Sequence, residues 1–184
     1  MWLAAKAREW GRDTAAEEVL WRIAEQFPRQ RWALQELAER ALAKGSTRDL
    51  HRVYCRMALE DPQDPQVQNN LAATRLLLRT DLERAHEEAS ELYARHPGEP
   101  VIASTYAYSL HLQQRAPEGL AALQQLSSSE LTNPGIALYY GILLRANGDT
   151  EGAREFLKLA ESARMLPEER QLLAESLEGL IRED

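Results

Sequence analysis

Leucine and alanine recur at spacings of three and four along almost the whole chain, as at Leu34, Leu37, Ala38 and Ala41. This spacing places apolar side chains on one face of a helix. β-branched residues are sparse, and no stretch alternates apolar and polar residues for long enough to indicate a sheet. The pattern therefore predicts an all-α protein.

Helix-breaking residues divide this pattern into short segments. Pairs such as Phe27-Pro28, Gly45-Ser46, His96-Pro97 and Gly148-Asp149 stand between the apolar runs. Short helices joined by such brief connections predict a series of helical hairpins.

A fixed period relates these hairpins to one another. A small or apolar residue early in each second helix recurs with steps of 34, 35, 34 and 34 residues, at Ala16, Leu50, Ala85, Gly119 and Ala153. The first helices give an independent series with steps of 34, 34, 35 and 34 residues, at Leu3, Leu37, Leu71, Tyr106 and Tyr140. Together the two series place one extra residue in the turn of the third repeat. A single helix pair cannot bury its apolar face, so neighbouring pairs must stack.

At this point the chain resembles the tetratricopeptide repeat (TPR) family. That family combines a bulky and then a small residue in the first helix, Gly-Asp at the turn, and alanine in the second helix. The last full repeat matches best, through Tyr140-Gly141, Gly148-Asp149, Ala153, Leu157 and Ala160. The fourth repeat departs from the pattern with Pro117-Glu118-Gly119 where alanine is usual.

The resemblance implies a right-handed superhelical α-solenoid that forms a single domain over residues 1–184. Its five repeats would lie near residues 1–29, 30–64, 65–99, 100–133 and 134–167, and a capping helix would follow at 168–184. In this register the first repeat would begin before Met1, so we expect the chain to start part-way through a repeat.

The glycine-rich stretch from Asn147 to Ala153 has two interpretations, a ligand-binding loop or a turn between helices. A phosphate-binding loop requires a preceding strand and a lysine, and both are missing. We therefore expect a turn, with Gly148 in the left-handed region and Asp149 or Thr150 capping the next helix.

All four tryptophans lie within the first 32 residues, at Trp2, Trp10, Trp21 and Trp32. One interpretation is that they fill the core of the first helix pair. The other is that Trp2 and Trp10 present an aromatic end face to a partner, to missing sequence or to a second copy of the chain, which would make a homo-oligomer.

Charge and composition exclude several classes of function. The formal net charge of −7, from 29 acidic and 22 basic residues, argues against nucleic acid as a partner. No apolar run approaches the length of a membrane helix, so we expect no membrane insertion. Cys55 is the single cysteine and no export signal is visible, which favours a cytoplasmic protein.

Catalytic and metal-binding patterns are missing from the sequence. The histidines are spread over several repeats without a metal-ligand spacing, and no nucleophile motif is present. We expect Cys55 to be a packed thiol. The sequence therefore predicts neither an enzyme nor a bound metal or cofactor.

The resemblance implies that the outward positions of the first helices line a concave groove that contacts a peptide or a partner helix. Carried over by register, the candidate partner-binding residues are Gln35, Glu36, Glu39, Asn69, Asn70, Ala73, Leu76, Thr105, Tyr108, His111, Tyr139, Ile142 and Arg145. Each could equally be an ordinary solvent-facing residue. Amides and aromatics are poor choices for an idle helix surface, so Asn69, Asn70 and Tyr108 are favoured. One subfamily of the TPR family binds the C-terminal carboxylate of a peptide through a clamp of lysine, arginine and asparagine. Asn70 falls at the asparagine position, but the lysine and arginine are missing, so we expect no such clamp.

Two functions follow as expectations. The first is a non-enzymatic scaffold that binds a protein or peptide segment in its groove. The second is a structural or regulatory segment of a longer multidomain protein, whose tryptophan-rich end packs on further sequence or self-associates.

Overall fold

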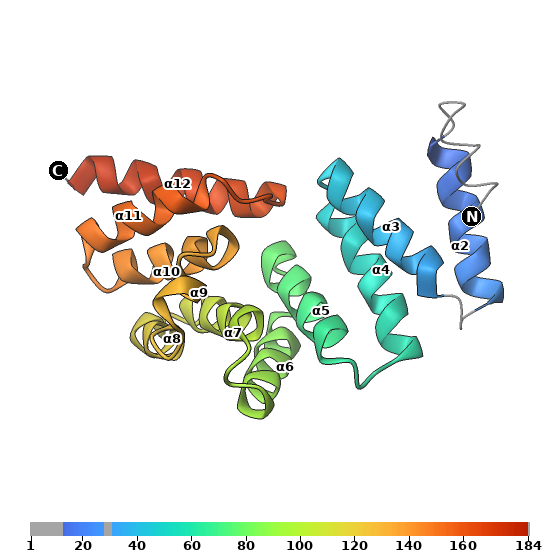
Figure 1. Ribbon diagram of the computed structural model, residues 1–184, viewed down its shortest axis with the longest axis horizontal. Coiled ribbons are helices and arrows are strands. Elements are labelled where there is room, and N and C mark those ends of the chain that lie inside the picture. The colour runs from blue at the N-terminus through green and yellow to red at the C-terminus, as the bar shows by residue number, and fades with distance from the viewer. Residues whose placement is uncertain (1–12, 28–30, 184) are drawn as a thin grey trace. The chain divides into compact units, whose positions relative to one another are not determined.

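The computed structural model describes residues 13–27 and 31–183, and every regular element among them is a helix (Figure 1). Backbone contacts divide the chain into two compact units, which we call the N-terminal unit (residues 1–71) and the C-terminal unit (residues 72–184). The division falls inside helix α5, and the single-domain organisation stays a prediction.

The N-terminal unit contains α2 (Asp13–Gln26), α3 (Arg31–Lys44), α4 (Thr47–Glu60) and the first half of α5 (Pro65–Leu78). Helix α3 packs against both α2 and α4. The core side chains come from the predicted apolar faces and include Ala16, Leu20, Leu34, Leu37, Leu50 and Val53. Burial of these leucines on neighbouring helices is what holds the hairpins together.

The C-terminal unit continues from the second half of α5 with seven further helices: α6 (Leu82–Arg95), α7 (Pro100–Leu112), α8 (Ala116–Leu123), α9 (Ser128–Leu131), α10 (Pro134–Ala146), α11 (Thr150–Ala160) and α12 (Pro167–Glu183). Helix α7 packs against α6 and α8, and α10 packs against α7 and α11. Helix α12 packs on both α10 and α11, as expected of a capping helix.

The all-α fold and the paired helices are confirmed. The pairs α3–α4, α5–α6, α7–α8 and α10–α11 fall within the predicted repeats at 30–64, 65–99, 100–133 and 134–167. The helices that open the third, fourth and fifth repeats share a start signal with the capping helix, because α5, α7, α10 and α12 each begin with proline at Pro65, Pro100, Pro134 and Pro167. Proline suits the first turn of a helix, where its missing N–H is not needed.

One hydrogen-bond pattern closes every described turn between paired helices. An N–H just past the end of the first helix donates to a carbonyl five residues earlier, at 2.9–3.0 Å, in the pairs Ser46–Ala41, Thr80–Arg75, Arg115–Leu110 and Asp149–Leu144. The residue before each donor has a positive φ, at Gly45, Arg79, Gln114 and Gly148. This is the Schellman arrangement, repeated with the period of the sequence.

The turn of the last pair decides between the two interpretations of the glycine-rich stretch, a ligand-binding loop or a turn between helices. Gly148 has φ +85°, and the carboxylate of Asp149 accepts a hydrogen bond of 2.9 Å from the N–H of Gly152. The stretch is therefore a helix C-cap followed by an N-cap, as predicted.

The extra residue of the third repeat is Asp81. In the second, fourth and fifth repeats the residue that completes the turn is also the N-cap residue of the next helix, as Asp149 is. In the third repeat Thr80 completes the turn and Asp81 is the N-cap residue of α6, with φ +47° and no capping hydrogen bond to its side chain. The insertion is thus confined to an exposed turn and leaves the helices intact.

Two helical glycines permit close approach between helices. A Cβ on Gly141 would lie 2.8 Å from Leu157 of α11, and a Cβ on Gly119 would lie 2.9 Å from the Ala107 carbonyl of α7. The fourth repeat also differs in its second helix, which stops after eight residues and is followed by the short α9. Ser127 starts α9 through a capping box with Glu130.

Candidate functional site

Each unit has a pocket to which the first helices of its helix pairs contribute side chains. In the N-terminal unit this pocket has a volume of about 280 Å³, and we call it the N-terminal pocket. Helices α3, α4 and α5 and the turn before α5 supply its lining: Arg31, Gln35, Ala38, Glu39, Leu42, Tyr54, Met57, Glu60, Asp61, Asp64, Gln66, Val67 and Asn70. Three candidate groove residues, Gln35, Glu39 and Asn70, come together here.

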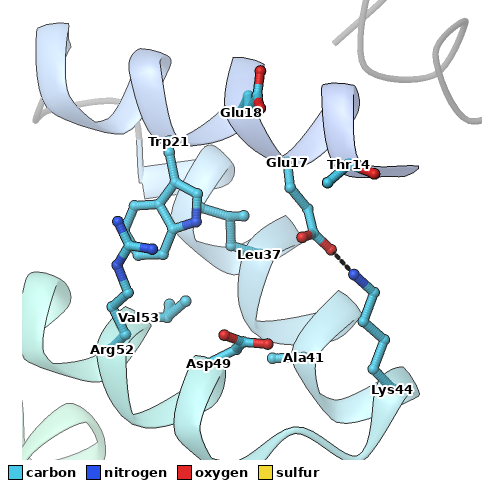
Figure 2. A pocket seen from close by; sticks show the side chains of 10 residues that line it. All are labelled: Thr14, Glu17, Glu18, Trp21, Leu37, Ala41, Lys44, Asp49, Arg52 and Val53. Carbon is cyan, nitrogen blue, oxygen red and sulfur yellow. Dashed lines mark hydrogen bonds and ion pairs between the residues drawn. The ribbon is translucent and has the colours of Figure 1, made fainter. Parts of the chain in front are cut away.

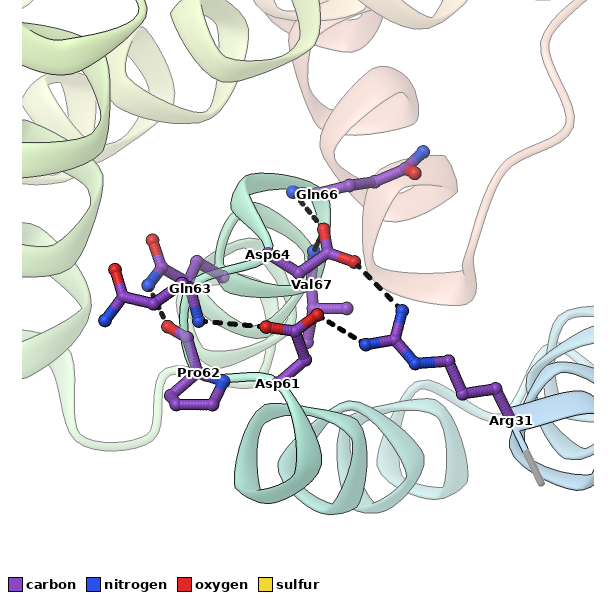
Figure 3. A network of polar contacts seen from close by, with 8 residues as sticks. Arg31, Asp61, Pro62, Gln63, Asp64, Gln66 and Val67 are labelled. Carbon is purple, nitrogen blue, oxygen red and sulfur yellow. Dashed lines mark hydrogen bonds and ion pairs between the residues drawn. The ribbon is translucent and has the colours of Figure 1, made fainter. Parts of the chain in front are cut away.

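One edge of the N-terminal pocket is a polar network between α3 and the turn before α5 (Figure 3). The guanidinium of Arg31 forms an ion pair with Asp61 and lies 3.9 Å from the carboxylate of Asp64. Asp64 also accepts the N–H groups of Gln66 and Val67 at 3.0 and 3.3 Å, and so caps α5. The hydrogen bond from Arg31 lowers the pKa of the Asp61 carboxyl.

A further part of the lining comes from α4. Burial raises the pKa of the Tyr54 hydroxyl, and the nearby charge of Glu39 adds to that shift. The Glu60 side chain is 11% exposed and lies 3.3 Å from Arg56 Nε. Neither Glu60 oxygen accepts a hydrogen bond from a described residue. The pocket is therefore acidic, with Arg31 as the single cation among its described lining residues.

The C-terminal unit has a larger and more polar pocket of about 390 Å³, which we call the C-terminal pocket. Its lining is Arg79, His111, Ile142, Arg145, Ala146, Leu172, Glu175 and Ser176. Three further candidate groove residues, His111, Ile142 and Arg145, come together in this lining. Burial, followed by the positive charge of Arg79, lowers the pKa of His111. The neutral imidazole is favoured at neutral pH as a result.

Tyr108 and Tyr139 were expected to face a groove, but both are buried, with 4% and 9% of their surface exposed. Helix α12 explains this difference. The Tyr139 hydroxyl donates a 2.8 Å hydrogen bond to Glu169 of α12, and the rings of Tyr139 and Tyr108 lie 5.1 Å apart. Burial raises the pKa of Tyr108 to about 12 and that of Tyr139 well above its usual value, with the charge of Glu169 adding to both.

Further candidates are also covered rather than open to solvent. Asn69 is 3% exposed, Leu76 is fully buried, and Thr105 is 6% exposed and donates to a carbonyl of its own helix at 3.1 Å. Glu36 and Ala73 are half-buried. Register alone places these residues on the groove side but does not account for the neighbouring side chains that cover them.

Sequence reasoning missed the residues that give the pockets their charge. Four of these residues lie at helix ends, outside the positions that the repeat register assigns to the groove: Arg31, Glu60, Asp61 and Asp64. The fifth, Glu175, belongs to α12. Asp64 followed by Pro65 is a sequence signal for a helix start, which would have placed that carboxylate beside α3 only if the packing were known.

Trp21 of α2 faces α4 across another pocket of the N-terminal unit (Figure 2). The guanidinium of Arg52 stacks 4.1 Å above the Trp21 ring. The lining of this pocket, which has a volume of about 190 Å³, is Thr14, Glu17, Glu18, Trp21, Leu37, Ala41, Lys44, Asp49, Arg52 and Val53. Trp32, in the first turn of α3, is half-buried. Trp2 and Trp10 lie outside the described residues, so their end-face role stays a prediction.

Two histidine contacts resemble parts of a nucleophilic site. The Ser109 hydroxyl lies 2.7 Å from His86 Nδ1, but Ser109 is fully buried, so a substrate cannot reach it. Cys55 Sγ lies 3.5 Å from His51 Nε2 one turn away on α4. Within residues 13–27 and 31–183 no three His, Cys, Asp or Glu side chains are arranged to hold a metal ion. No described helix is long and apolar enough to cross a membrane.

The chain has the TPR fold. Its structure is similar to the crystal structure of a thermophilic TPR protein from Thermus thermophilus, with a TM-score of 0.59 over 95% of each chain and 19% sequence identity. No protein-family model and no curated protein matches the sequence. The likeness therefore lies in the arrangement of the helices, and residue identities contribute little to it.

Proposed function

We propose that this protein is a non-enzymatic interaction scaffold that binds a segment of a partner protein along its first helices. The observation that carries the proposal is the N-terminal pocket, which brings Gln35 and Glu39 of α3 together with Asn70 of α5. Amide side chains there can both donate to and accept from a peptide backbone. Helical repeats of this fold commonly offer such surfaces for extended partners.

The chemistry of the described residues supports binding rather than catalysis. Ser109, which has a histidine partner, is fully buried, and Cys55 lines neither the N-terminal nor the C-terminal pocket. Nucleophilic catalysis needs a nucleophile that a substrate can reach, beside a base that activates it. The N-terminal pocket instead offers apolar surface edged by charge, which suits side chains of a protein partner.

The experiment is a selection of binding peptides from a random library against the full chain. Affinities of the selected peptides are then measured by fluorescence anisotropy for the wild type and for Asn70→Ala and His111→Ala. We expect one of these changes to weaken binding by about tenfold, the effect of losing a central contact. Lys158→Ala, an exposed change on α11, is the control and should leave affinity unaltered.

Selected peptides that bind both pocket variants as tightly as the wild type would place recognition elsewhere on the protein. Failure to select any peptide would count against a peptide-binding scaffold altogether.

A further inference from the structure

The lining of the N-terminal pocket contains charged residues and an apolar part, which we call its floor. Leu42, Met57 and Val67 are half-buried there, and Ala38 is almost fully buried. At about 280 Å³ the pocket lies at the lower end of the range for ligand sites, which starts at about 300 Å³. That volume is sufficient for one long side chain.

The charged residues of the lining determine which kind of partner side chain the pocket would bind. Four carboxylates, those of Glu39, Glu60, Asp61 and Asp64, line the pocket with the guanidinium of Arg31. Arg31 engages Asp61 and Asp64 at one edge, as Figure 3 shows. Glu39 of α3 is exposed.

The position of Glu60 strengthens the negative field. Its carboxylate is largely buried, so water screens its charge less than that of a surface group. Arg56 offsets this charge at 3.3 Å without forming a hydrogen bond to it. The raised pKa of Tyr54 agrees with an acidic environment, because burial and the charge of Glu39 both disfavour its phenolate.

We propose that the N-terminal pocket receives an arginine side chain of the partner, with the aliphatic stem on Leu42, Met57 and Val67 and the guanidinium beside Glu39. This proposal rests on the proposed scaffold function and specifies its partner as a basic protein segment. Arginine combines an apolar stem with a planar charged head, which matches an apolar floor beside a carboxylate. The contact of Arg31 with Asp61 and Asp64 is an arrangement of the same kind within the chain.

Charge complementarity excludes the opposite class of partner. An acidic or phosphorylated segment would bring negative charge to four carboxylates and would lose the affinity that its other contacts supply. A neutral apolar side chain could occupy the floor but would leave the Glu39 carboxylate less solvated and unpaired with the partner.

The test is an NMR titration of the ¹⁵N-labelled full chain with N-acetylarginine amide. The comparison ligand is N-acetylcitrulline amide, which keeps the shape of arginine and removes its charge. We expect shifts at Gln35, Glu39, Tyr54 and Asn70 with the arginine compound, about threefold or more weaker binding of citrulline, and weaker binding as salt is raised.

Matched variants assign the effect to the pocket. Glu39→Gln should weaken arginine binding by about three- to tenfold, the range for one charged contact at a partly exposed site. Glu18→Gln changes the net charge equally but lies on α2 in the pocket of Figure 2, and it should bind as the wild type does. Unchanged spectra confirm that both variants fold.

Equal binding of arginine and citrulline, shifts outside the pocket, or equal losses in both variants would overturn the proposal. So would selected library peptides that bind this pocket without a basic residue, although the scaffold function would then stand. If no peptide is selected but the arginine compound binds as expected, the pocket chemistry stands and the scaffold function fails.

Discussion

Gln114 occupies a backbone conformation that usually belongs to glycine. Its φ is +61°, and Arg79 has φ +53° at the same place in the preceding repeat. Gly45 and Gly148 occupy this place in the other two described turns. A left-handed residue with a side chain costs about 1–2 kcal/mol, so two of the four turns are strained.

Replacing Gln114 with glycine should relieve that strain. We expect Gln114→Gly to raise the free energy of unfolding by about 0.5–1 kcal/mol, because the relief exceeds the entropy cost of glycine in the unfolded chain. Urea unfolding followed by circular dichroism measures the change. Gln113→Gly, at φ −86°, is the matched control and should destabilise the protein. A lower stability of Gln114→Gly would show that the Gln114 side chain contributes contacts that outweigh the strain.

His111 should make the stability of the protein depend on pH. Its pKa is lowered in the folded state by burial and by Arg79, while an unfolded histidine titrates at about pH 6.5. As pH falls below about 6.5 the unfolded state binds more protons, so stability falls until the folded pKa is passed. The full contribution of neutral His111 to the stability of the folded state is present above about pH 6.5.

Guanidinium unfolding between mildly alkaline and mildly acidic pH should therefore show a smaller loss of stability in His111→Gln than in the wild type. His86, whose pKa burial also lowers, stays as a common background in both proteins. The groups facing His111 in its pocket are Arg79, Arg145 and Glu175, and the Tyr108 ring stacks 6.4 Å away. Parallel pH profiles for the two proteins would assign the dependence to other groups.

At the scale of the helix pair, Gly141 of α10 permits the close approach of α11, because its side chain is only a hydrogen atom. A Cβ on Gly141 would lie 2.8 Å from Leu157 Cγ and 3.1 Å from the Leu157 backbone nitrogen. Because one of these atoms belongs to the backbone, a rotamer change alone cannot make room. The last repeat is the one that matches the TPR pattern best, and this glycine is the small residue of that pattern.

Gly141→Ala should force α10 and α11 apart and destabilise the C-terminal unit by about 1–3 kcal/mol, the range for overpacking. Thermal unfolding by calorimetry measures this loss. Gly135→Ala, in the first turn of the same helix, has its nearest atom at 3.7 Å and should change stability by less than about 0.5 kcal/mol. Equal effects of the two changes would argue against a packing cause.

Some features of the helices and their packing could be predicted from the sequence, and others could not. Helix pairs, their period and the turn at Gly148 follow from local spacing and capping chemistry, and all are confirmed. The burial of Tyr108 and Tyr139 depends on where α12 packs, and α12 carries no signal that it lies beside those rings. Likewise, the second helix of the fourth repeat contains Gly119 and stops after eight residues, before the short α9. The presence of Gly119 does not by itself predict this early stop.

Across the whole molecule, the candidate site was predictable only as separate residues. Gln35, Glu39 and Asn70 were identified by register, and the structure brings them to one pocket. The acidic character of that pocket depends on Asp61 and Asp64, whose place beside α3 depends on tertiary packing. The net charge of −7 is distributed so that four acidic side chains line this one pocket.

The overall charge leads to a prediction for nucleic acids. At physiological salt, labelled single-stranded RNA and double-stranded DNA should show no rise in fluorescence anisotropy with tens of micromolar protein. Affinity for these polymers comes chiefly from phosphate neutralisation, which a chain of net charge −7 does not supply. A saturable rise that weakens with salt would contradict this expectation.

The turn at Thr80 and Asp81 has a practical consequence for protein engineering. It already contains one residue more than the corresponding turns, its side chains are exposed, and both flanking helices keep their full length. Exposed turns of this kind are where added sequence is tolerated best. A fluorescent reporter introduced between these two residues would leave the N-terminal pocket unaltered, because the whole lining of that pocket lies earlier in the chain.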